Sequence, residues 1–147
     1  MIRLDLSKNK IKSISVFTIE ESFPNLKWLD VSNNKFIELP GIKCPKLEYF
    51  DISYNKLEKI NEGWVGHPNI KVLKSVDNKF KNLAPFKNMP KLEELYLANN
   101  MLTSISGSEN NGSLRLLHLR RNKIDKIEDE LADLPSLSYL NLRSNKI

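Results

Sequence analysis

One asparagine-centred pattern, which recurs seven times along the 147 residues, restricts the fold of this sequence most strongly. A copy has apolar residues at its first, fourth, sixth and eleventh positions and an asparagine at its ninth. The asparagines are 21 to 25 residues apart: Asn9, Asn34, Asn55, Asn78, Asn100, Asn122 and Asn145. Self-similarity at this period predicts a solenoid in which each repeat packs on its neighbours.

The spacing within a copy predicts its local structure. In the second copy, the apolar Leu26, Leu29 and Val31 surround Trp28 and Asp30, which take the alternate positions. Such alternation indicates a short, half-buried strand, and seven strands side by side form a parallel sheet. The asparagine follows the strand, and its amide both donates and accepts hydrogen bonds. We therefore expect stacked asparagines to join the turns of adjacent repeats.

This pattern is the leucine-rich repeat signature. It predicts an α/β solenoid, a leucine-rich repeat horseshoe with a concave parallel β-sheet and short 3-10 or helical turns on the convex side. Residues 1–147 form one such domain. Residues 15–25 are predicted to hold a helical turn, and 106–113 a flexible convex loop without apolar anchors. Neither end carries a polar capping repeat, so the expectation is that these repeats belong to a longer chain.

Composition excludes several classes of function. The net charge of +5 is spread over both halves, so a basic arm for nucleic acid is not indicated. No window resembles a membrane span. Cys44 is the only cysteine, which rules out an intrachain disulfide and favours a reducing compartment such as the cytoplasm. Neither a phosphate-binding glycine loop nor zinc-ligand spacing is present, so no metal, cofactor or small-molecule substrate is predicted.

The residues that could carry chemistry have simpler interpretations. Cys44 and His67 share a repeat position with apolar residues, which places them in the convex core. His118 points outward from a strand without a catalytic neighbour, so we interpret it as a contact residue. Ser75 replaces a core leucine and is predicted to bond to the backbone. No catalytic residue is assigned.

The outward strand positions carry the stronger functional signal. The first column is Arg3, Trp28, Tyr49, Val72, Glu94, Leu116 and Tyr139, and the second is Asp5, Asp30, Asp51, Lys74, Tyr96, His118 and Asn141. The third is Ser7, Ser32, Ser53, Val76, Ala98, Arg120 and Arg143, and the fourth is Lys8, Asn33, Tyr54, Asp77, Asn99, Arg121 and Ser144. All four tyrosines and Trp28 belong to this face, as expected of a protein-binding surface. The alternative is that aromatic residues simply suit strands.

Eleven residues of this face are the predicted contacts for a protein partner: Trp28, Asp30, Tyr49, Asp51, Tyr54, Tyr96, His118, Arg120, Arg121, Tyr139 and Arg143. Charge is sorted along them, since aspartates lie in the N-terminal repeats and arginines in the C-terminal ones. This bipolar arrangement suits a protein segment of opposite polarity better than a uniform polyanion.

A second candidate surface follows the asparagines. The next residue is lysine in six of seven repeats: Lys10, Lys35, Lys56, Lys79, Lys123 and Lys146. Such a column is either a solubilising edge or a binding edge for an acidic protein tail such as that of tubulin.

Three C-terminal runs carry a closer resemblance. LYLANNML (95–102), LHLRRNKID (117–125) and SLSYLNLRSNKI (136–147) resemble leucine-rich repeat proteins of ciliary radial spokes, and the whole repeat form resembles the intracellular SDS22-like class. The resemblance implies a non-catalytic scaffold of the cilium or flagellum axoneme, with spoke or other axonemal proteins as partners. The rivals are a regulatory subunit of a protein phosphatase and a microtubule- or dynein-associated repeat protein. An enzyme is the least favoured class. An RNA-associated repeat protein stays an alternative, against which the distributed charge argues.

Overall fold

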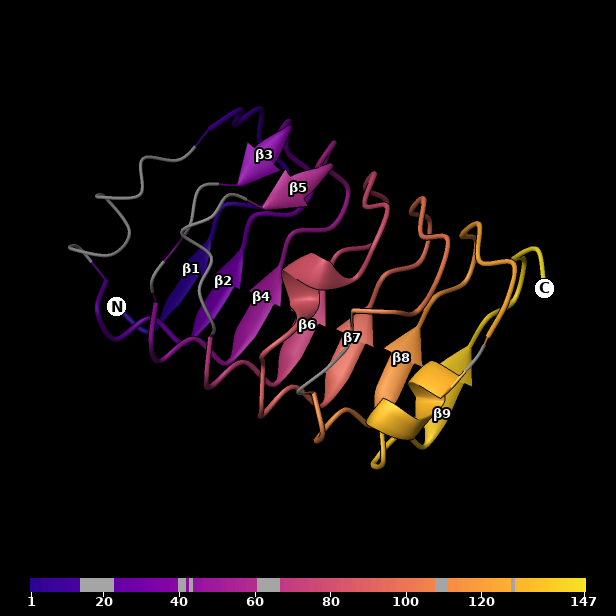
Figure 1. Cartoon of the computed structure of the whole chain (residues 1–147). Helices are drawn as coiled ribbons and strands as arrows, with labels where there is room; N and C mark the ends of the chain where they lie inside the picture. The colour runs from indigo at the N-terminus through magenta and orange to yellow at the C-terminus, as the bar shows by residue number, and fades with distance from the viewer. Residues whose placement is uncertain (14–22, 40–41, 43, 61–66, 108–110, 128) are drawn as a thin grey trace.

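The computed structural model describes residues 1–13, 23–39, 42, 44–60, 67–107, 111–127 and 129–147. Within them, seven strands form one parallel sheet in the order β1-β2-β4-β6-β7-β8-β9, and the two termini lie at opposite ends of the row (Figure 1). The strands are β1 (Arg3–Asp5), β2 (Trp28–Asp30), β4 (Tyr49–Asp51), β6 (Val72–Lys74), β7 (Glu94–Tyr96), β8 (Leu116–His118) and β9 (Tyr139–Asn141).

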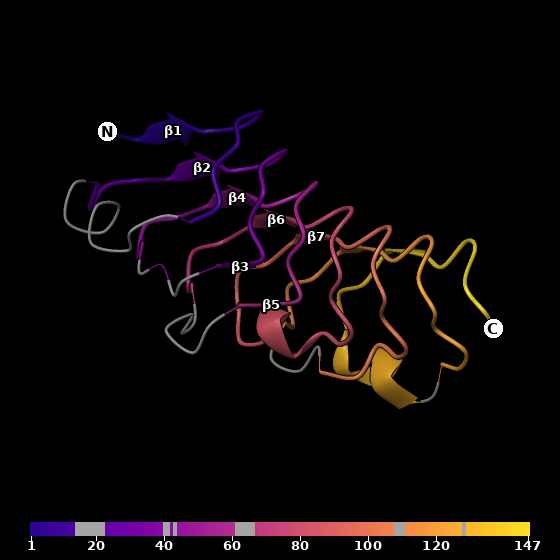
Figure 2. The ribbon, with the colours of Figure 1, turned by 90° about the horizontal axis from the view of Figure 1, so that it is seen from above.

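Where the structure describes the return segments, their regular structure is short. A two-stranded parallel sheet joins β3 (Glu38–Leu39) to β5 (Lys59–Ile60), and two 3-10 helices, η1 (Ala84–Phe86) and η2 (Asp129–Asp133), lie in later repeats. Seen from above, the coiled ribbons lie on the side opposite the main sheet (Figure 2). The predicted solenoid with 3-10 turns is therefore confirmed. The helical turn predicted in 15–25 falls largely on residues 14–22, outside the described part.

No helix in the described residues is long and apolar enough to cross a membrane. The structure instead buries one continuous core, which includes Leu29, Phe50, Leu73, Leu95 and Leu117 from the middles of successive strands. The first and third residues of these strands are only partly buried. The period-two alternation thus sends one side chain per strand inward and two outward.

The turns after the strands are joined by the predicted asparagines, which we call the Asn ladder. The amide nitrogen of Asn100 donates to the carbonyl of Leu97 in its own turn and to that of Ser75 in the preceding repeat, at 3.1 and 2.8 Å. Its amide oxygen accepts from the backbone N–H of Phe80 at 3.1 Å. Asn34, Asn55, Asn122 and Asn145 make the equivalent three contacts, so the prediction is confirmed.

The residue before each ladder asparagine has a left-handed backbone. These residues are Lys8, Asn33, Tyr54, Asp77, Asn99, Arg121 and Ser144, with φ between 53° and 61°. This conformation costs an L-residue free energy, and asparagine tolerates it better than most. The fourth outward column therefore lies on the turn and not on the strand.

A second repeated turn leads into the strands. The carbonyls of Phe23, Cys44, His67, Met89, Asn111 and Leu134 each accept a hydrogen bond from the backbone N–H three residues on. Proline follows in five of these six turns, because its fixed φ suits the second position of such a turn. His67 and Cys44 are each only 2% exposed, which confirms that they belong to the convex core.

Residues 106–113 carry no apolar anchor, but the sequence interpretation missed that the polar Asn111 is buried. Asn111 bonds the preceding repeat through the carbonyl of Phe86 and the N–H of Met89. Ser75 was expected to bond the backbone, but its hydroxyl accepts from the side-chain amide of Asn78 at 3.3 Å. Asn111 thus satisfies backbone groups of the preceding repeat, whereas Ser75 bonds within its own repeat. Residues 108–110 lie outside the described part.

Candidate functional site: the concave face of the sheet

The outward positions of the seven strands form a surface that we call the concave face. Strand pairing aligns Arg3, Trp28, Tyr49, Val72, Glu94, Leu116 and Tyr139 in one row, and Asp5, Asp30, Asp51, Lys74, Tyr96, His118 and Asn141 in another. These are the first and second predicted columns, without a slip near Ser75. The structure therefore brings the predicted contact residues of the strands onto one surface.

The N-terminal part of this face is aromatic and acidic, and we call it the acidic half. The rings of Trp28 and Tyr49 stack almost parallel, with centroids 5.0 Å apart and an interplanar angle of 6°. The guanidinium of Arg3 lies over the Trp28 ring, 3.7 Å from its centroid, which is a cation–π contact. Burial, followed by the charges of Asp51 and Asp30, raises the pKa of Tyr49 to about 12, so its hydroxyl stays protonated.

The three aspartates of the acidic half also shape their own turns. One carboxylate oxygen each of Asp5, Asp30 and Asp51 accepts from the backbone N–H two residues on, at 2.8 to 3.0 Å. Hydrogen bonds from the hydroxyl and backbone N–H of Ser7 lower the pKa of Asp5. These local bonds fix the carboxylates in place, and the turn bond at Asp30 uses one of its two oxygens. The same aspartates can thus stabilise their turns and also bind a partner.

The centre of the face mixes charge with small side chains. The Lys74 ammonium lies 5.4 Å from the ring centroids of both Tyr49 and Tyr96. The Tyr96 hydroxyl donates to Glu94 at 2.8 Å, and burial together with this bond raises the pKa of Tyr96 to about 12. Small residues occupy the third column here, with Val76 and Ala98 half-buried.

The C-terminal part, which we call the basic half, carries His118, Arg120, Arg121 and Arg143. Tyr96 and His118 are ring neighbours, with centroids 6.2 Å apart. Burial, and then the charge of Arg120, lowers the pKa of His118, which favours the neutral imidazole. The Nε2 atom of His118 and the Nε atom of Arg120 are buried without a hydrogen-bond partner among the described residues. Arg121 and Arg143 are exposed.

Two predicted contact residues differ from the rest in backbone setting. Tyr54 and Arg121 lie on the left-handed turn beyond the strands, and Tyr54 is 52% exposed. Tyr139 lies on β9, the last strand in the sheet, and is 48% exposed. These side chains border the concave face at its turn edge and at its C-terminal end.

Sequence reasoning missed a row of charges directly before the first column. Glu48 pairs with Lys27 at 3.0 Å and with Lys71 at 3.2 Å, across two strand interfaces. Hydrogen bonds from Lys27 and then Lys71 lower the pKa of Glu48. Glu93 and Arg115 continue the alternation of sign in the next repeats. Comparing the residue before each first-column position would have revealed this pattern, which we call the paired rim.

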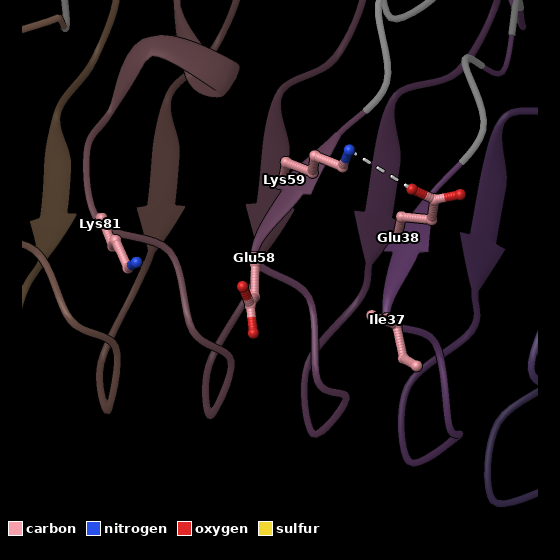
Figure 3. Close-up of a pocket in the computed structure, with 5 residues that line it drawn as sticks. All are labelled: Ile37, Glu38, Glu58, Lys59 and Lys81. Carbon is pink, nitrogen blue, oxygen red and sulfur yellow. Dashed lines mark ion pairs between the residues drawn. The ribbon is translucent and has the colours of Figure 1, made fainter.

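The lysine edge is only partly available to an acidic partner. Lys10, Lys35, Lys56, Lys123 and Lys146 are exposed. Lys79 is half-buried and pairs with Glu58 at 3.3 Å. Nearby, Ile37, Glu38, Glu58, Lys59 and Lys81 line an open hollow of about 310 Å³. Figure 3 shows the Glu38–Lys59 ion pair across this hollow, so its charges are partly satisfied within the chain.

Three family models of leucine-rich repeats match this chain. The model described as "Leucine Rich repeats (2 copies)" covers residues 24–64, "Leucine Rich Repeat" covers 91–111, and "Leucine rich repeat" covers 108–147. Together with the solenoid and its Asn ladder, these matches define the class. The chain is a leucine-rich repeat protein, and such repeats form protein-binding domains.

Curated relatives agree with this class. The chain is 30% identical to leucine-rich repeat-containing protein 23 of Bos taurus over 98% of its own length and 47% of the relative. It is 31% identical to Tsukushi of Gallus gallus over 98% of its own length and 41% of that protein. The chain thus spans less than half the length of these relatives. Other leucine-rich repeat proteins score similarly.

Most of these relatives are non-catalytic repeat proteins. One is leucine-rich repeat serine/threonine-protein kinase 1 of Mus musculus, which is 32% identical over 86% of this chain and only 7% of the kinase. Among solved structures, a TLR13–ssRNA13 complex superposes with a TM-score of 0.71 at 25% identity, covering 99% of this chain and 25% of that one. The LRIM1/APL1C complex reaches 0.76 at 22% identity, covering 99% and 31%, and shows the shared fold.

Among the residues the structure describes, no group of three or more His, Cys, Asp or Glu side chains could hold a metal ion. The chemistry available on the concave face is instead that of recognition: stacked rings, fixed carboxylates and guanidinium groups. This arrangement is suited to holding a protein segment.

Proposed function

We propose that this chain is a non-catalytic scaffold of the ciliary axoneme, in the radial spoke, which binds another spoke or axonemal protein through its concave face. The proposal places the protein in the cytoplasm of the cilium or flagellum. Its support is the resemblance of residues 95–102, 117–125 and 136–147 to radial-spoke repeat proteins, together with the 30% identity to leucine-rich repeat-containing protein 23 of cattle and human.

The observation that carries the binding role is the concentration of aromatic and charged side chains on one face. Trp28, Tyr49 and Tyr96 are fixed by ring or hydrogen-bond contacts before any partner arrives. Rigid aromatic side chains lose little conformational entropy on binding, so they suit the centre of an interface. On the paired rim beside them, Glu48 is already paired with Lys27 and Lys71 within the chain.

The test is retention in axonemes. Full-length tagged protein is expressed in cells with motile cilia, the membrane is removed with detergent, and the axonemes are extracted with rising salt. We expect the protein to stay with the axoneme and to leave it together with spoke proteins, as followed by mass spectrometry. Recovery in the detergent-soluble fraction beside phosphatase activity would instead support the regulatory-subunit rival.

A charge-reversal pair connects this test to the concave face. Arg120→Glu with Arg121→Glu changes the charge by four, as does Lys123→Glu with Lys146→Glu on the lysine edge. We expect only the first pair to release the protein from axonemes. Release by the second pair alone, with salt-sensitive binding to tubulin, would favour the microtubule-associated rival.

A further inference from the structure

We propose that the partner's segment is bipolar: an extended stretch of polypeptide with basic side chains at one end and acidic side chains about six residues away. It lies across the strands, with its basic end on the acidic half and its acidic end on the basic half. The proposal rests on the proposed protein-binding role of the concave face and specifies the chemistry of that partner.

Among the described residues, no ion pair involves the aspartates of the acidic half or the arginines of the basic half. Ion pairs among the described residues involve Lys27, Lys59, Lys71 and Lys79 with Glu38, Glu48 and Glu58, all outside both halves. The aspartates of the acidic half and the arginines of the basic half form none of these pairs. The ion pairs of the described residues thus lie outside the two halves, whose carboxylates and guanidinium groups are left for a complementary partner.

Each half has groups suited to a particular side chain. Asp30 and Asp51 are neighbours in the parallel register, beside the Trp28–Tyr49 stack, and so offer carboxylates and aromatic rings to a lysine or arginine. In the basic half, Arg121 and Arg143 are exposed. A guanidinium binds a carboxylate through two parallel hydrogen bonds, so these two side chains are suited to an aspartate or glutamate of the partner.

The sheet fixes the spacing between the two ends of the partner. Four steps separate β2 from β8 in the strand order β2-β4-β6-β7-β8. Neighbouring strands are about 4.8 Å apart, so the two centres of charge are about 20 Å apart. An extended chain advances about 3.3 Å per residue, which gives about six residues between the basic and acidic side chains. The small Val76 and Ala98 lie between the two halves.

Uniformly charged segments fit the face less well. A wholly acidic segment would place carboxylates over Asp30 and Asp51, and a wholly basic one would place cations over Arg120 and Arg143. Like charges placed side by side make the binding free energy less favourable and so select against the wrong partner. The bipolar segment alone finds opposite charge at both ends.

The test is selection from a random peptide library displayed on phage, with the purified chain as bait. Peptides of about 12 residues are long enough to cross the sheet when extended. We expect enrichment of lysine or arginine paired with aspartate or glutamate at a separation of about five to seven residues, in either chain direction. A synthetic bipolar peptide with this spacing should bind about ten-fold tighter than uniformly acidic or uniformly basic peptides of equal length.

Two variants separate the halves. Asp30→Asn with Asp51→Asn keeps an oxygen for each turn bond while removing two negative charges, and Glu38→Gln with Glu58→Gln is the control with the same charge change. The first pair should abolish selection for basic side chains and keep that for acidic ones. Arg120→Glu with Arg121→Glu should shift the preference toward peptides that are basic at both ends.

The outcomes distinguish this proposal from the proposed function. One outcome is that the selected peptides carry a single charge sign or no fixed spacing, and that the concave-face variants still weaken their binding. This would overturn the bipolar segment, but the concave face would still be the protein-binding surface. Absence of enrichment, or enrichment indifferent to these variants, would overturn the bipolar segment, while axonemal retention tests the spoke role separately. Light scattering tests whether the chain associates with itself. If it does, and if both variants abolish this association, a second copy of the chain binds the concave face instead.

Discussion

The Asn ladder and the concave face are built on the same repeat but behave oppositely along the chain. Internal ladder asparagines such as Asn100 and Asn122 make the same three contacts with their own and the preceding turn. On the concave face, by contrast, a row changes from Asp30 through Lys74 to His118. The Asn ladder thus repeats the same hydrogen bonds in successive repeats, whereas the side chains of the concave face change in charge and size.

This difference distinguishes the residues that stabilise the solenoid from the residues that are available to bind a partner. A buried amide that stacks on its neighbour must be the same in each repeat, because every turn presents the same backbone groups. An outward side chain has no such constraint and can differ from strand to strand. Changes to the ladder should therefore affect stability, and changes to the concave face should affect recognition.

The largest effect is expected from Asn100→Ala. This substitution removes hydrogen bonds to the carbonyls of Ser75, Leu97 and Ala98 and leaves the N–H of Phe80 without its acceptor. Unsatisfied buried groups should lower the free energy of unfolding by about 2 to 4 kcal/mol in urea denaturation.

Asn9 provides the matched control. Among the residues that the structure describes, its amide donates within its own exposed turn, to the carbonyls of Leu6 and Ser7. Asn9→Ala should therefore cost less than about 1 kcal/mol. Equal losses for Asn9→Ala and Asn100→Ala would show that contacts between repeats contribute little, contrary to the role given to the ladder.

The next effect concerns the convex side. Gly107 has a φ of +94°, and an added Cβ would lie 3.1 Å from the backbone nitrogen of Ala84 in η1. Gly107→Ala should therefore cost about 1 to 2 kcal/mol in thermal or urea unfolding. Gly112→Ala is the control, since a Cβ there meets no atom within 4 Å, and it should be neutral or slightly stabilising. A neutral Gly107→Ala would contradict the close packing of this loop on η1.

A smaller change is expected at Tyr54, where a substitution should increase stability. This residue has a φ of 55°, and asparagine adopts that conformation more readily, so Tyr54→Asn should raise the free energy of unfolding by about 0.5 kcal/mol. Tyr139→Asn on β9 is the control and should lower it slightly, because tyrosine favours strands. If Tyr54 contributes to recognition, the more stable variant should also bind axonemes less well. Higher stability with unchanged binding would remove Tyr54 from the contact surface.

The smallest effect is a pH dependence. The lowered pKa of His118 means that the unfolded chain binds a proton more readily, so stability falls as the pH drops below about 6.5. A glutamine cannot be protonated, so the free energy of unfolding of His118→Gln should not fall in this way. Relative to the unsubstituted protein, it should rise by about 0.5 kcal/mol when the pH is lowered from about 7.5 to about 5. The gain is small because solvent screens a side chain that is only partly buried. Urea titrations at both pH values measure this difference, and a constant difference would mean that the imidazole is not desolvated.

The sequence alone determined the repeat, its strands and the members of each outward column. Alternation around Leu29 and Leu95 distinguishes inward from outward positions, and the asparagine spacing fixes how neighbouring strands align. Because both signals recur in every repeat, even the missing leucine at Ser75 did not shift the register.

How the side chains pair depends on the three-dimensional arrangement of the repeats. The parallel stacking of Trp28 on Tyr49, the bridge from Glu48 to two lysines and the burial of Asn111 join residues from different repeats. Their geometry depends on the rotamers and spacing of stacked strands, which a pattern of residue types does not contain. The repeat thus set the shape of the molecule, whereas contacts between repeats decided which charges stay unpaired for a partner.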